Sequence, residues 1–211
     1  MCSESRSFRG GAAYNVVNAV MFSVDLCGLI WYNLHEMRVS VLAKHTQKYR
    51  IDYSVAIPMS NKNLQRIIKF YLFECPVKGK SVRGKKFEDY GITKSPAFSA
   101  LKKSMMENAT LSLRKNYKPC VKGDLQVSFD EMEKTSPTDE YCVFLKYDEK
   151  TVMQSLFSAI RNAFAHGSFC IKRYSGTPIY FLVNYDGYLK AQIVLHESTL
   201  LSWIDCIKNF E

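Results

Sequence analysis

Apolar residues recur every three or four positions along much of the chain, which is the spacing of one buried helix face. This pattern predicts one long helix, or two helices in line, over residues 11–48. It also predicts a helix that Ser60 caps and Pro76 ends, and another that starts at Ser95, directly before Pro96. Up to about residue 110, the pattern is therefore mainly helical.

The helical pattern returns after residue 148, where Asp148 can cap a further helix. Its buried stripe is expected to consist of Val152, Leu156, Ile160 and Phe164. Gly167 can end this helix, because glycine readily adopts the left-handed conformation that helix ends require.

Strand patterns are concentrated near the carboxyl terminus. Residues 169–174, 179–183 and 189–195 are predicted as three strands, separated by the turn sequences Ser-Gly-Thr-Pro and Asn-Tyr-Asp-Gly. The patterns are mixed over 118–147, where a short strand at 125–129 and a polar linker at 134–140 are expected. A closing helix is predicted over 198–210. We therefore expect one domain over 1–211, mainly α-helical, with a small antiparallel β-hairpin or three-strand element at 169–196.

Positive charge is concentrated in one part of the chain. The net charge is +9, and residues 69–122 hold 13 basic against 4 acidic residues, so the remainder is neutral. Such a segment attracts nucleic acid or an anionic membrane surface, although a solvated face would explain the same charges. Interleaved aromatic residues favour nucleic acid. The basic loop at 78–90 supplies the candidate RNA-binding residues Lys80, Arg83, Lys85 and Lys86.

The sequence offers no pattern that predicts a metal, a cofactor or a membrane span. The 7 cysteines are an odd number without close pairs, which is typical of reduced thiols in the cytoplasm. The apolar stretch at 12–32 contains Asp25, which is costly inside a membrane. Residues 79–86 have the spacing of a phosphate-binding loop, but Lys86 stands where that motif needs Ser or Thr.

Candidate chemistry is found in Arg161, Asn162 and His166, near the end of the helix that follows residue 148. A histidine can gain or lose a proton near neutral pH, and an arginine can neutralise charge that builds up on a phosphate. Residues five apart differ by about 140° around a helix, so the arginine and the histidine point differently. The long reach of Arg161, a distorted helix end or a second subunit could bring them together. A structural role for both side chains is the alternative.

The sequence Ile-Arg-Asn-Ala-Phe-Ala-His-Gly-Ser at 160–168 resembles the signature of the HEPN superfamily, in which an arginine and a polar residue precede a histidine. The strands and the closing helix after Gly167 are similar to those of small bacterial HEPN proteins. The resemblance implies a helical bundle, a homodimer with a composite active site, and metal-independent cleavage of RNA.

Under this resemblance, His166 is the general acid or base for attack by the ribose 2′-hydroxyl, Arg161 stabilises the transition state, and Asn162 orients the RNA. The substrate is single-stranded or looped RNA, and the protein acts as a toxin or defence effector, so an antitoxin or regulatory protein is a candidate partner. Some HEPN proteins are inactive modules that bind RNA, a nucleotide or a partner protein. That function, and a generic helical interaction protein, are the alternatives.

Overall fold

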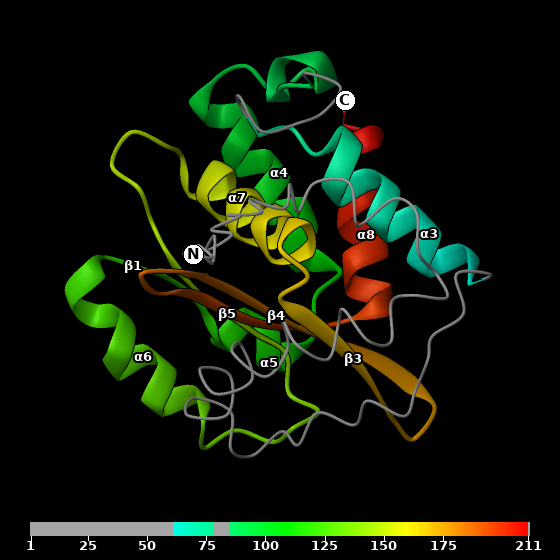
Figure 1. Ribbon diagram of the computed structural model, residues 1–211. Coiled ribbons are helices and arrows are strands. Elements are labelled where there is room, and N and C mark those ends of the chain that lie inside the picture. The colour runs from blue at the N-terminus through cyan, green and yellow to red at the C-terminus, as the bar shows by residue number, and fades with distance from the viewer. Residues whose placement is uncertain (1–60, 78–84, 211) are drawn as a thin grey trace, which may run out of the picture. The chain divides into compact units, whose positions relative to one another are not determined.

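A five-stranded mixed sheet forms the centre of the computed structural model, which describes residues 61–77 and 85–210 (Figure 1). The strands are β1 (Tyr117–Cys120), β2 (Tyr141–Leu145), β3 (Phe169–Tyr174), β4 (Thr177–Asp186) and β5 (Tyr188–His196). Their order in the sheet is β1-β2-β5-β4-β3. β1 and β2 are parallel, and the other neighbouring strands are antiparallel.

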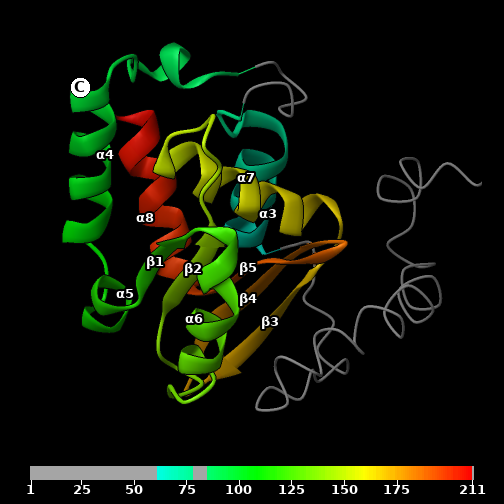
Figure 2. The same cartoon turned by 90° about the vertical axis from the view of Figure 1, so that its left-hand side faces the viewer.

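Helices cover both faces of the sheet (Figures 1 and 2). The larger group consists of α3 (Lys62–Ile68), the π-helical segment η2 (Lys69–Glu74), α4 (Ser95–Glu107), α5 (Leu111–Lys115), α7 (Val152–Ala165) and α8 (Glu197–Lys208). Its apolar side chains share one core cluster with Cys142 and Phe144 of β2. On the opposite face, α6 (Leu125–Met132) packs in a second cluster with Tyr141 and Val143. We call these the helix-layer face and the α6 face.

The prediction of a mainly helical bundle with a small β element is wrong, because the sheet has five strands and is a central layer. The three carboxyl-terminal strands are confirmed: β3 has the predicted bounds, while β4 and β5 are longer. β1 and β2 were missed. All five residues of β2 are buried, so this strand lacks the polar alternation that marks a half-exposed strand.

The strand predicted at 125–129 is also wrong, because these residues begin the helix α6. Leu125, Val127 and Phe129 alternate with polar residues and so fit a strand pattern. In the structure Leu125 and Phe129 are buried one helical turn apart, while Val127 is 62% exposed. The helix also joins β1 to β2, which are parallel and therefore need a crossover connection.

The predicted helix starts are close to the observed ones but differ in the capping residue. Asn61 caps α3 by accepting hydrogen bonds from the backbone N–H groups of Asn63 and Leu64, whereas Ser60 lies outside the described residues. α4 includes Ser95 and has Lys94 as its cap. The predicted helix over 11–48 also lies outside the described residues. Within the described ranges, no helix is long and apolar enough to cross a membrane.

The end of the predicted polar linker holds a fully buried carboxylate, Glu140. Its two oxygens accept hydrogen bonds of 2.7 Å from the Thr110 hydroxyl and from the backbone N–H of His196. Thr110 caps α5, and His196 is the cap of α8. Glu140 therefore joins the start of β2 to the starts of two helices that are distant in sequence.

Candidate functional site

α7 carries Arg161 and Asn162, is followed directly by His166, and is fixed at its start by a capping box. The Thr151 hydroxyl accepts a hydrogen bond from the Gln154 backbone N–H, and the Gln154 side chain accepts one from the Thr151 N–H. Thr151 is thus the cap, and the prediction that Asp148 caps this helix is wrong because the helix begins three residues later. The aromatic ring of Tyr71 stacks on Phe157 and Phe164, with centroid separations of 6.1 and 5.6 Å, and holds α7 against η2.

The carboxyl end of α7 positions His166. The backbone N–H of Ser168 donates to the Ala163 carbonyl over 2.8 Å, and that of Gly167 donates to the Phe164 carbonyl over 3.2 Å. Gly167 has a φ of 61°, so these bonds form the Schellman ending predicted from the glycine. His166 is the cap residue and is exposed. The residue therefore lies at the carboxyl end of α7, where the helix dipole is negative.

Arg161 lies one turn before the end of α7 and is partly buried. Its Nε atom is buried and has no hydrogen-bond partner among the residues that the structure describes. Burial raises the pKa of the Cys75 thiol, and the positive charge of Arg161 offsets part of that rise. Cys75 directly follows η2, and its thiol donates to the Phe157 carbonyl over 3.8 Å. The positive charge of Arg161 therefore acts on the Cys75 thiol, at the junction between η2 and α7.

The Nε of Arg161 has no hydrogen-bond partner among the described residues, so this atom does not bond to the imidazole of His166. Positions five apart on a helix differ by about 140° around its axis. Asn162 is partly buried, and its carbonyl accepts a 3.0 Å hydrogen bond from the His166 backbone N–H. Asn162 and His166 are therefore neighbours on one helical turn, as their spacing of four predicts.

Two of the four predicted RNA-binding residues, Lys80 and Arg83, lie outside the described residues. Lys85 and Lys86 are exposed. The Lys85 ammonium lies 5.9 Å from the centroid of the Tyr90 ring, and Lys86 precedes the 3-10 helix η3 (Phe87–Tyr90), whose Phe87 is buried. The described end of the predicted basic loop is thus a turn anchored in the core.

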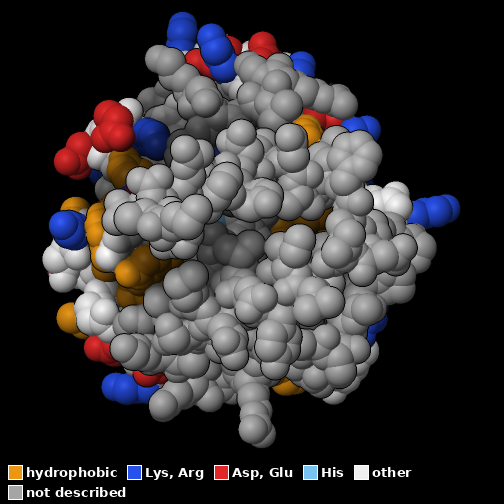
Figure 3. All heavy atoms as spheres, viewed as in Figure 1, with side chains coloured by type: hydrophobic (Ala, Val, Ile, Leu, Met, Phe, Trp, Pro, Cys, Tyr) orange, Lys and Arg blue, Asp and Glu red, His pale blue; other side chains and the backbone are white. Residues whose placement is uncertain are grey.

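Other basic residues of the 69–122 segment have local partners. Arg114 donates to the carbonyls of Glu107 and Ala109 at the end of α4, and Lys118 forms an ion pair with Glu131. The Lys102 ammonium lies 5.0 Å from the centroid of the Tyr117 ring. In the view of Figure 3, lysine and arginine side chains are visible at the margin of the molecule, several of them beside acidic ones.

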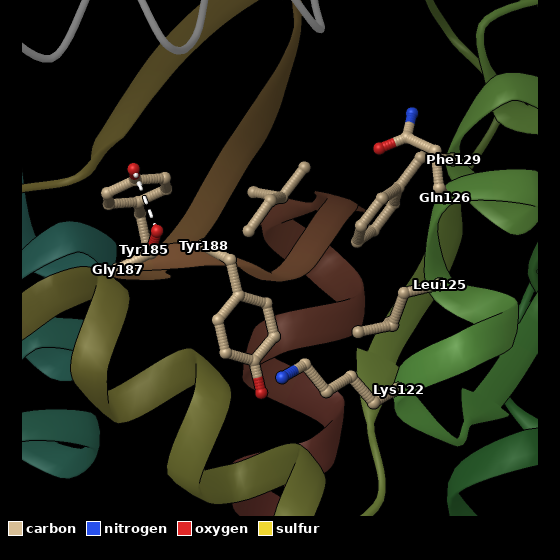
Figure 4. Close-up of a pocket in the computed structure, with 8 residues that line it drawn as sticks. Lys122, Leu125, Gln126, Phe129, Tyr185, Gly187 and Tyr188 are labelled. Carbon is tan, nitrogen blue, oxygen red and sulfur yellow. Dashed lines mark hydrogen bonds between the residues drawn. The ribbon is translucent and has the colours of Figure 1, made fainter.

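A cavity of about 390 Å³ opens on the α6 face, between α6 and the turn that joins β4 to β5 (Figure 4). Its lining consists of Lys122, Leu125, Gln126, Phe129, Tyr185, Gly187, Tyr188 and Leu189. The sequence does not predict this cavity, because its two sides are far apart in the chain and meet only when the sheet forms. The one available signal was the Tyr-Asp-Gly-Tyr turn at 185–188, which places two aromatic residues beside a glycine.

Candidate metal ligands are not grouped in the described residues: no cluster of three or more His, Cys, Asp or Glu side chains there could hold an ion. The five described cysteines, Cys75, Cys120, Cys142, Cys170 and Cys206, are free thiols. Comparisons of the chain with protein-family models, curated proteins and solved structures find no match.

Proposed function

We propose that the chain is a metal-independent endoribonuclease that cuts single-stranded or looped RNA, with Arg161 and His166 as its catalytic pair. The observation that supports this most is the state of Arg161, whose Nε is buried without a partner among the described residues. A buried nitrogen that makes no hydrogen bond lowers stability. An anion that binds there, such as an RNA phosphate, would give this nitrogen a partner and would explain why an arginine lies near the exposed His166.

In the proposed reaction, the ribose 2′-oxygen attacks the adjacent phosphorus while the bond from phosphorus to the 5′-oxygen breaks. A base takes the proton of the 2′-hydroxyl, and an acid gives a proton to the departing 5′-oxygen. The products are a 2′,3′-cyclic phosphate and a free 5′-hydroxyl. His166 acts as acid or base, Arg161 neutralises charge on the phosphate, and Asn162, one turn from the histidine, orients the RNA.

The proposed active form is a homodimer, in which Arg161 of one subunit faces His166 of its partner. This arrangement removes the difficulty that the two residues point in different directions from one helix. The proposed setting is the cytoplasm, where the enzyme acts as a toxin or defence effector that an antitoxin or regulatory protein restrains.

The test is RNA cleavage in excess EDTA by the wild type and by Arg161→Ala and His166→Ala. We expect each substitution to lower the rate by about 10²- to 10⁴-fold, as is typical for loss of a general acid or base or of a charge stabiliser. Asn162→Ala should cost less. The matched control is Arg173→Ala, which removes an exposed arginine from β3. Undiminished cleavage by both catalytic variants would sink the assignment.

Mixed dimers test the composite site. Arg161→Ala and His166→Ala subunits are inactive alone, but a dimer with one of each contains one site with both residues intact if the pair is shared between subunits. We expect mixing to restore a fraction of the wild-type rate. If each subunit holds its own complete site, mixing restores nothing.

The second candidate is an RNA-binding module without catalysis. The five-stranded sheet supports it, because this fold departs from the helical bundle that the motif implied. This candidate predicts salt-sensitive RNA binding and no cleavage by the wild type. A purely structural role for Arg161 and His166 predicts instead that both substitutions lower the melting temperature and leave RNA affinity unchanged.

A further inference from the structure

The cavity on the α6 face is shaped by an irregularity in the sheet. Asn184 pairs with Ala191 and Tyr185 with Leu189, so Lys190 is an extra residue in β5. Such a bulge re-aims the side chains beside it. Ala191 accordingly belongs to the helix-layer face, while Leu189 belongs to the α6 face. The end of the β4–β5 hairpin is thus turned toward α6.

The floor of the cavity is apolar and its rim is polar and aromatic. Leu125, Phe129 and Leu189 are buried beneath it. Tyr185 on the rim is 47% exposed, although its hydroxyl donates to the Gly187 carbonyl over 3.1 Å. Figure 4 shows Tyr188, Leu125 and Phe129 facing a common space. A volume of about 390 Å³ lies within the range of small-ligand sites, which span about 300–1,000 Å³.

Two lysines lie beside the ring of Tyr188, which lines the cavity. The ammonium groups of Lys122 and Lys190 lie 4.8 and 5.2 Å from the centroid of the Tyr188 ring. Lys190 is neutralised by an ion pair with Asp186. Lys122 is exposed and forms no ion pair with any described residue, so its charge is available at the mouth of the cavity.

We propose that this cavity binds a nucleobase, with Tyr185 and the apolar floor against the base and Lys122 on the adjoining phosphate. Aromatic rings beside lysines are the combination by which proteins bind single-stranded nucleic acid without reading its sequence. The exposed Gln126 lies at the rim; its amide nitrogen donates to the Asp130 carboxylate over 2.7 Å, and its amide oxygen can accept a hydrogen bond from a base edge. The ligand chemistry is a base with its phosphate, whether in an RNA strand or in a free nucleotide.

β4 connects the cavity to the residues that directly follow α7. The Ser168 carbonyl, two residues after His166, accepts a 2.9 Å hydrogen bond from the backbone N–H of Val183 in β4. Tyr185 follows Val183 by two residues, which is about 7 Å along a strand. An RNA strand that passes His166 therefore needs to extend by only a few nucleotides around the hairpin to place a base in the cavity. In this respect the inference rests on the proposed function.

The test measures binding of a short fluorescent oligoribonucleotide by anisotropy, and of AMP by calorimetry, in a His166→Ala background that does not cleave. Loss of one stacked base should weaken oligonucleotide binding roughly 5- to 100-fold in Tyr185→Ala. Lys122→Ala should reduce the salt slope by about 1. Tyr185→Phe keeps the ring and should bind normally. Lys134→Ala is the matched control, because it removes an exposed lysine just beyond α6.

Weaker binding of either probe in both cavity variants supports the proposal, and the probe affected tells RNA from free nucleotide. Unchanged binding of both probes overturns it, as does an equal loss in Lys134→Ala. The two proposals fail separately. If the wild type does not cleave RNA but Tyr185→Ala and Lys122→Ala bind more weakly, only the ribonuclease proposal is refuted. If the wild type cleaves RNA and these two variants bind as well as the protein with an intact cavity, only the cavity proposal is refuted.

Discussion

Removing the Glu140 carboxylate should destabilise the fold more than any surface substitution. Its side chain is fully buried, and it accepts two 2.7 Å hydrogen bonds, from the Thr110 hydroxyl and the His196 backbone N–H. Glu140→Ala removes both acceptors and leaves two donors without their partner. It also leaves a hole where β2 meets the starts of α5 and α8.

The magnitude follows from those contacts. Hydrogen bonds to a charged group contribute about 1.5–3 kcal/mol each, so we expect the loss of two in Glu140→Ala to lower the free energy of unfolding by about 3–6 kcal/mol. That is a large share of a total of about 5–15 kcal/mol. Glu140→Gln keeps the shape and one acceptor oxygen, and should lose about 1–2 kcal/mol.

Urea unfolding, monitored by circular dichroism, measures these changes in the free energy of unfolding. They follow from the shift of the urea midpoint when the dependence of the free energy on urea concentration is unchanged. Glu149→Ala is the matched control because Glu149 is exposed, and its change should stay within about 0.5 kcal/mol. A loss below about 1 kcal/mol in Glu140→Ala, or a loss equal to that of the control, would refute the reasoning.

Two further predictions concern the end of α7 and the buried thiols. Gly167→Ala should cost about 1 kcal/mol in urea unfolding, because φ is 61° there and a Cβ would meet no atom within 4 Å, so backbone strain alone acts. Gly167→Asn should cost less, and equal costs would contradict this. Burial raises the pKa of Cys170 to about 11 and raises the pKa of Cys142. Above pH 9 the unfolded thiols lose protons that the folded state retains, so the melting temperature should fall from pH 9 to 11, less steeply in Cys170→Ala; a flat profile would contradict this.

The sequence predicts what local patterns determine. The helix stripe of α7, its end at Gly167 and the three strands after it follow from spacing and turn residues within about ten positions. Arg161, Asn162 and His166 could be proposed for the same reason, since all three lie near one helix end. Whether they act on one phosphate stays a prediction, because a single helix does not determine it.

Features that depend on distant residues were missed. β2 is apolar throughout because both of its faces are covered. The alternation of Leu125, Val127 and Phe129 with polar residues resembles a strand, whereas in the helix only Leu125 and Phe129 are buried. The sequence places Glu140 in a polar linker, because its two hydrogen-bond partners lie 30 and 56 residues away in the chain. The cavity beside Tyr185 likewise forms only when α6 meets the β4–β5 hairpin.

The chemistry of the cleaved ends tests the central claim most directly. The wild type, incubated in EDTA with an RNA and with a DNA of the same sequence, is predicted to cut only the RNA and to leave 2′,3′-cyclic phosphate and 5′-hydroxyl ends by mass spectrometry. His166→Ala should leave the RNA intact over the same time. Cleavage of the DNA, 5′-phosphate ends, or unchanged cleavage by His166→Ala would contradict the assignment of Arg161 and His166 as a metal-independent ribonuclease pair.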